Sequence, residues 1–112
     1  MNQQRNFLDE ARVDVTATLS ANPRSLYTLW TEYNQGIGGR KAAKYFNASE
    51  RGRVKHKYCM RKPFWTLVAH MIRSGDNSAV AIEKIYDAYG QDSTTTSILR
   101  QIRADKGARL QY

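Results

Sequence analysis

Residues 36–62 read GIGGRKAAKYFNASERGRVKHKYCMRK, and the interpretation of the whole chain starts from them. The part from Arg40 to Lys62 contains nine lysine and arginine residues and one acid, Glu50, whereas the rest of the chain carries equal numbers of basic and acidic side chains. The net charge of +8 is therefore concentrated in this segment. Because each neutralised phosphate releases condensed counterions, such a segment favours binding to nucleic acid over a solvated basic helix with no specific partner.

The length and composition predict one compact domain. The chain has 112 residues, of which 41% are hydrophobic, and this is enough for a single core. The only cysteine, Cys59, excludes an intramolecular disulfide, and the longest nearly apolar run, residues 64–72, is too short to span a bilayer. We therefore expect a soluble intracellular protein.

The spacing of apolar residues predicts an all-α fold, a compact bundle of about five to six short helices with a helix-turn-helix-like basic helix. Helical segments are expected over residues 5–20, between Ser25 and Gly36, over 40–46 and 48–62, from Phe64 to Gly75, from the Asp76–Ser78 cap to Gly90, and from Asp92 or Ser93 to about residue 105. Alternating apolar residues in the first segment also permit a strand there. The expected division is an N-terminal helix and linker (1–24), a helical DNA-binding domain (25–105) and a frayed tail (106–112).

Capping and helix-breaking residues define the expected ends of these helices. Ser25 and either Asn47 or Ser49 can accept a hydrogen bond from an exposed backbone N–H at a helix start. The glycines within residues 36–39 permit the positive φ angles of a tight turn. Pro63 removes a backbone donor, so the basic helix is expected to end there and a core helix to begin.

Residues 48–74 combine an apolar stripe with flanking positive charge. The residues that recur at helical spacing are Val54, Tyr58, Arg61, Trp65, Val68 and Ile72. Lysines and arginines flank this stripe on both sides, where they could reach the two phosphate strands of a groove. The opposite face contains His56, which could read base edges.

No set of residues in the sequence indicates catalytic activity. His56 and Cys59 have a ligand-like spacing, but with His70 as the only other histidine a closed zinc site lacks ligands. The acidic residues are scattered singly, so no pair suggests acid–base chemistry. We therefore expect no enzymatic activity, no metal and no cofactor.

The aromatic residues divide into two groups. Tyr45 and Tyr58 lie among basic residues and are the better candidates for stacking on bases. The others fit helical periods and are expected in the core: Trp30, Tyr33, Trp65, Tyr86 and Tyr89.

The motif Leu29-Trp30-Thr31-Glu32-Tyr33, followed by Gly36-Ile37-Gly38-Gly39-Arg40 and then by Arg53, Tyr58, Arg61-Lys62 and Trp65, resembles a known DNA-binding domain type. This type is found at the C-terminus of the yeast transcriptional activator of glycolytic genes, in fungal stress-response transcription factors and in Crypton-type tyrosine recombinases. The resemblance covers about residues 25–73. It implies a small all-helical domain that binds double-stranded DNA, a role in transcription regulation or in a mobile element, and a nuclear location. It also implies that Trp30 and Tyr33 support the core and that Gly36 and Gly39 form the turn.

We therefore predict a double-stranded DNA-binding domain that docks a basic helix, residues 48–62, in the major groove. A homodimer is possible. RNA or single-stranded DNA binding remains an alternative, as does a protein-interaction module whose basic helix binds an acidic partner. The predicted DNA-contacting residues are Arg40, Lys41, Lys44, Arg51, Arg53, Lys55, His56, Lys57, Arg61 and Lys62.

Overall fold

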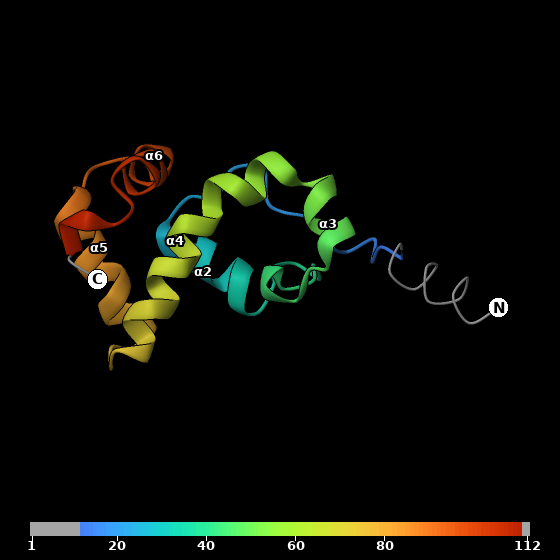
Figure 1. The fold of residues 1–112 in the computed structure, drawn as a ribbon, viewed down its shortest axis with the longest axis horizontal. Helices are drawn as coiled ribbons and strands as arrows, with labels where there is room; N and C mark the ends of the chain where they lie inside the picture. The colour runs from blue at the N-terminus through green and yellow to red at the C-terminus, as the bar shows by residue number, and fades with distance from the viewer. Residues whose placement is uncertain (1–11, 111–112) are drawn as a thin grey trace.

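The computed structural model describes residues 12–110, and every regular element in this range is helical (Figure 1). The predicted all-α fold class is confirmed. Within the same range, no helix combines the length and the apolar character that crossing a membrane would require. The elements are α2 (Leu26–Asn34), the 3₁₀ helix η1 (Ala43–Tyr45), α3 (Ala48–Arg53), α4 (Lys55–Arg73), α5 (Ser78–Tyr89), α6 (Thr95–Asp105) and the 3₁₀ helix η2 (Ala108–Leu110).

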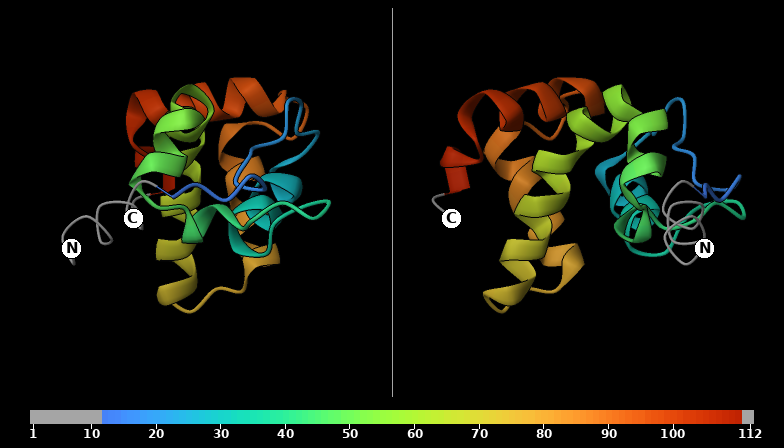
Figure 2. Two further views of the ribbon diagram at one scale, coloured as in Figure 1. Left: turned by 90° about the vertical axis from the view of Figure 1, so that its right-hand side faces the viewer. Right: turned by 45° about the vertical axis from the view of Figure 1, so that its right-hand side comes forward.

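Helix α4 is the central element, and it packs against α2, α3, α5 and α6 (Figures 1 and 2). Steps of one, three and three residues place its most buried side chains on one face. The Nε1–H of Trp65 donates to the carbonyl oxygen of Leu29 at 2.8 Å, so this buried indole also joins α4 to α2. Four inward side chains are at most 1% exposed: Phe64, Trp65, Val68 and Met71.

The basic segment is interrupted at Val54, which corrects the prediction of one helix that ends at Pro63. Val54 leaves the helical conformation (φ −119°, ψ 31°) between α3 and α4, while α4 continues through Pro63. A proline inside a helix removes a backbone hydrogen bond, but here the helix buries its largest apolar side chains directly after the proline, and that burial outweighs the local cost. The ribbon of α4 changes direction in its first half (Figure 1).

Residues 12–20 follow an irregular path, so the helix predicted over 5–20 is wrong for this part; residues 5–11 lie outside the described range. Ala17 and Leu19 are nevertheless buried in the core. The valines and threonines of the segment have low helix propensity. Buried carboxylates of α2 and α3 accept hydrogen bonds from its backbone, which therefore needs no helix to satisfy them.

The segment after α6 is packed up to residue 110, where the sequence predicted a frayed tail. Lys106 ends α6 in the left-handed conformation (φ 57°), Gly107 is buried, and Leu110 packs against the core. The last two residues of the predicted tail lie outside the described range. The core therefore extends beyond the predicted domain bounds of 25–105, because Ala17, Leu19 and Leu110 also pack in it.

The helix starts follow the capping chemistry of the sequence. The side chains of Ser25, Asn47 and Asn77 each accept a hydrogen bond from a backbone N–H in the first turn of α2, α3 and α5. Thr94 caps α6 in the same way, one residue after the predicted Ser93. These ends were predictable because a cap is a local interaction.

The glycine turn after α2 is also confirmed. Gly36, Gly38 and Gly39 all have positive φ angles, of 84°, 59° and 79°. At Gly36 a Cβ atom would lie 2.1 Å from the carbonyl oxygen of Arg40, so this position excludes any side chain. Around Gly38 and Gly39 there is open space.

Candidate nucleic-acid interface

The exposed cations of residues 40–62 lie on the loop after α2, on helix α3 and on the first turns of α4, and the ribbons of these elements adjoin one another in Figure 1. Helix α3 is joined to the loop because Arg51 Nη1 donates to the carbonyl oxygen of Phe46 at 2.6 Å. Arg51 and Lys57 are half-buried. The exposed members are Arg40, Lys44, Arg53, Lys55, His56 and Lys62, and these eight residues together are called the basic surface below.

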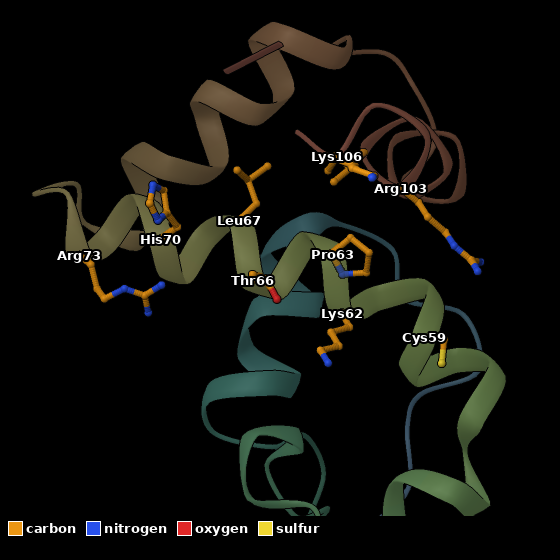
Figure 3. Close-up of a pocket in the computed structure, with 10 residues that line it drawn as sticks. Cys59, Lys62, Pro63, Thr66, Leu67, His70, Arg73, Arg103 and Lys106 are labelled. Atoms are coloured by element: carbon orange, nitrogen blue, oxygen red, sulfur yellow. The ribbon is translucent and has the colours of Figure 1, made fainter. Parts of the chain in front are cut away.

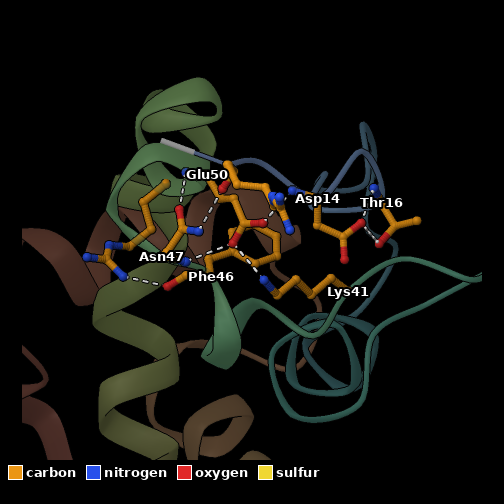
Figure 4. Close-up of polar contacts among 8 residues, drawn as sticks. Asp14, Thr16, Lys41, Phe46, Asn47 and Glu50 are labelled. Atoms are coloured by element: carbon orange, nitrogen blue, oxygen red, sulfur yellow. Dashed lines mark hydrogen bonds and ion pairs between the residues drawn. The ribbon is translucent and has the colours of Figure 1, made fainter. Parts of the chain in front are cut away.

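The acid inside this segment, Glu50, is withdrawn from the surface (Figure 4). It is 1% exposed, and its carboxylate accepts hydrogen bonds from Lys41 Nζ (2.7 Å) and from the backbone N–H groups of Asn47 and Asp14 (2.8 Å each). Burial by itself raises the pKa of Glu50, but these hydrogen bonds outweigh it and lower the pKa below its usual value. The basic surface therefore carries no exposed acid from residues 40–62.

Lys41 cannot be treated as a free cation. Its ammonium group pairs with Glu50, and its side chain is 25% exposed. This pair completes a network that begins with the capping box between Asn47 and Glu50 at the start of α3. We therefore remove Lys41 from the predicted DNA contacts.

Arg61 is also structural. It is 5% exposed; its Nη1 donates to Glu32 Oε1 and its Nη2 to the carbonyl oxygen of Ser20, both at 2.6 Å. Its partner Glu32, on α2, is only 2% exposed. Arg61 therefore joins α4, α2 and the segment before α2, and it is also removed from the predicted DNA contacts.

The two candidate stacking residues occupy different environments. Tyr58 is partly buried between Phe46 and Trp65, with ring centroids 6.3 and 5.4 Å away, and burial raises its pKa. Tyr45 is 65% exposed, and Lys44 Nζ lies 5.1 Å from its ring centroid. Tyr45 alone of the two remains available to a base. Trp30 and Tyr33 pack against the core.

Helix α6 brings further cations beside α4 that sequence reasoning missed. A cavity of about 270 Å³ lies between the start of α4 and the start of α6, and His56, Lys57 and Arg100 line it. Arg103 lies three residues further along α6, on the same side of the helix. The spacing of Arg100 and Arg103 was the available signal, but all residues outside 40–62 had been counted together as neutral.

Asp14 is exposed beside Lys41 and Glu50, but several other acids lie away from the basic surface. Glu83 and Asp87 are exposed on α5, and Asp76, just before α5, pairs with Lys84 at 3.0 Å. By contrast α4 contains no acid, and the acid of α6, Asp105, accepts a hydrogen bond from Tyr89. Helix α5 and the residues just before it therefore carry exposed acids, whereas α4 carries cations alone.

Residues 12–110 contain no group of three or more histidine, cysteine, aspartate or glutamate side chains that could hold a metal ion. His56 and Cys59 are both exposed on α4. Comparisons of the chain with protein-family models, with curated proteins and with solved structures found no match.

Proposed function

We propose that this chain is a double-stranded DNA-binding domain that uses the basic surface. The observation that carries the proposal is the contrast around α3: the acid of the segment is buried, while the neighbouring cations are exposed. Exposed cations that outnumber the exposed acids around them, here Asp14, retain their attraction for phosphate. The resemblance of residues 25–73 to a DNA-binding domain type points to the same function.

The docking element is the first part of α4, not a continuous helix over 48–62. At 100° per residue, Lys55, Cys59 and Lys62 share one exposed face of α4. An α-helix fits the major groove, where His56 and Cys59 would lie near base edges and the lysines near phosphates. Arg40, from the loop after α2, and Lys44, from η1, would contact phosphates of the DNA backbone beside the groove.

The expected salt dependence follows from the number of exposed cations. Removing Lys41 and Arg61 leaves about five exposed lysine and arginine side chains on the basic surface. Five neutralised phosphates correspond to a slope of about −4.5 in the logarithm of the binding constant against the logarithm of salt concentration. Fluorescence anisotropy with a labelled duplex at several KCl concentrations measures it, and a slope near zero would reject the proposal.

A matched pair of variants separates this surface from general charge. Lys44→Gln with Arg53→Gln removes two cations from the basic surface and should flatten the slope by about 1.8. Lys84→Gln with Arg109→Gln removes the same charge elsewhere and should change it much less. Equal losses in both would mean that the net charge, not the basic surface, attracts DNA.

Single-strand binding is the second candidate because Tyr45 is exposed beside Lys44. Stacking on an aromatic side chain contributes about 1–3 kcal/mol per base. Competition between duplex DNA, single-stranded DNA and RNA of equal length decides between the two. Preference for a single strand, lost in Tyr45→Ala, would favour this candidate. Selection of bound duplexes from a random pool would then report any base sequence and half-site spacing.

A further inference from the structure

A groove of about 620 Å³ is lined by side chains of α4 and of the end of α6, and no residue of the loop after α2 lines it (Figure 3). Pro63 and Leu67 lie on the side of α4 that faces α6, and Arg103 and Lys106 come from α6. Ile102 completes the apolar floor. The complete lining is Cys59, Lys62, Pro63, Thr66, Leu67, His70, Arg73, Ile102, Arg103 and Lys106.

The charge around this groove has one sign. Lys62 and Arg73 border it from α4, Arg103 and Lys106 border it from α6, and none of its lining residues is an acid. Cations that surround an apolar floor suit a ligand that is both apolar and negatively charged. Duplex DNA would neutralise these cations but would leave the apolar floor without an apolar partner.

At the C-terminal end of α6, the backbone of Lys106 and Gly107 forms one end of the groove. Lys106 adopts a left-handed conformation, and the buried Gly107 follows it with φ 76°. A Cβ atom on Gly107 would lie 3.3 Å from Leu67 Cδ1, which shows how closely the backbone passes over the floor. At the other end, Arg103 Nη1 reaches Met60 Sδ on α4 at 2.8 Å.

The length of the groove favours an elongated ligand. On α4 its lining runs from Cys59 to Arg73, which corresponds to about 20 Å at 1.5 Å per residue. A helix of about 14 residues has this length. Two helices that present an apolar groove accept a third amphipathic helix, whose i, i+3, i+4 and i+7 side chains contact the floor.

We propose that the groove binds an acidic amphipathic helix of a partner protein. The apolar face of that helix packs on Pro63, Leu67 and the methyl group of Thr66, and its carboxylates pair with Lys62, Arg73 and Lys106. The inference goes beyond DNA binding, and Cys59 and Lys62 belong both to the groove and to the proposed DNA-docking face of α4. A DNA-bound domain of this kind recruits a second protein through α4 and α6.

The test uses a synthetic helical peptide of about 15 residues, with leucine at i, i+3, i+4 and i+7 and glutamate on the remaining face. A scrambled peptide of the same composition is the peptide control. Thr66→Glu places a like charge in the groove and should weaken binding by more than about tenfold. Arg73→Gln with Lys106→Gly removes two cations, and glycine suits the backbone at position 106.

Lys84→Gln with Arg109→Gln, away from the groove, is the matched control for charge and should bind the peptide like the parent chain. Circular dichroism establishes that each variant is folded, and duplex binding is measured on the same preparations. Peptide binding that Thr66→Glu abolishes, with a much smaller change in duplex affinity, supports the proposal, even if the parent chain binds no DNA. Equal binding of the scrambled peptide, or full binding by Thr66→Glu, overturns it. Decanoate, an apolar chain with a carboxylate, tests for a small ligand in place of a helix. If decanoate displaces the peptide, or if the chain associates with itself through the groove, the proposal is overturned because the occupant is not a partner helix.

Discussion

The cations of residues 40–62 fall into two groups that differ in what they contact. Lys41 and Arg61 pair with carboxylates that are 1% and 2% exposed, whereas Lys44 and Arg53 lie on the surface. Side-chain type and sequence position do not separate the groups. The positions of Glu50 and Glu32 do, because a buried carboxylate is stable only when cations or N–H groups surround it. Two of the nine cations are therefore committed to buried carboxylates, whereas the others pair with no carboxylate within the described residues 12–110.

The largest expected effect is loss of stability in Arg61→Met. Removing one member of a buried ion pair leaves Glu32 charged and unpaired, so the free energy of unfolding should fall by about 3–5 kcal/mol. Urea denaturation measures it. The neighbouring Lys62→Met should stay within about 0.5 kcal/mol of the parent chain. If Arg61→Met were as stable as Lys62→Met, the distinction between structural and exposed cations would fail. The double variant Glu32→Leu with Arg61→Met should recover much of the loss.

The next effect concerns the glycine turn, which positions both Lys41 and Lys44. Gly36→Ala forces a Cβ against the Arg40 carbonyl and should cost about 3 kcal/mol of stability, while Gly39→Ala, in open space, should cost about 1 kcal/mol. Thermal unfolding of both variants gives the comparison. Equal losses would mean that the close approach at Gly36 is not rigid.

Lys41→Met and Lys44→Met each remove one positive charge, so they compare a cation that is paired with a buried carboxylate with an exposed cation directly. Lys41→Met removes a hydrogen bond to a buried carboxylate and should lower stability by about 1–2 kcal/mol while it leaves the salt slope of DNA binding unchanged. Lys44→Met should do the reverse, with a slope flatter by about 0.9 and a stability change within about 0.5 kcal/mol. The same response in both variants would show that the paired and the exposed cations do not differ in their roles.

The smallest effect is in the dependence of stability on pH. The pKa of Glu50 is lowered in the folded chain, so this group contributes stability that is fully present above its usual value of 4.5 and is lost as the pH falls below that value. Urea midpoints between pH 3 and pH 7 should therefore fall less steeply on acidification in Glu50→Gln. An unchanged slope would assign the acid sensitivity to other carboxylates.

Sequence reasoning succeeded where an interaction is local. The caps at Ser25, Asn47 and Asn77 and the turn at Gly36 depend on neighbouring residues, and so does the helical period of α4. It was wrong at residues 12–20 and at Pro63, where distant contacts decide the outcome. Arg61 was wrongly predicted to contact DNA, although its place within an apolar stripe was a signal of its inward position.

The sequence by itself determined that the chain is helical, where several helices begin, and that its excess charge lies in one segment, because propensity, capping and charge belong to residues that are close in the chain. The tertiary structure alone decided which cations are committed to carboxylates and which remain exposed. It also brought α6 beside α4 and formed the groove that their cations border. The physical reason is burial: whether a charge is solvated, paired or left facing a cavity depends on the segments that pack around it, and these are distant in sequence.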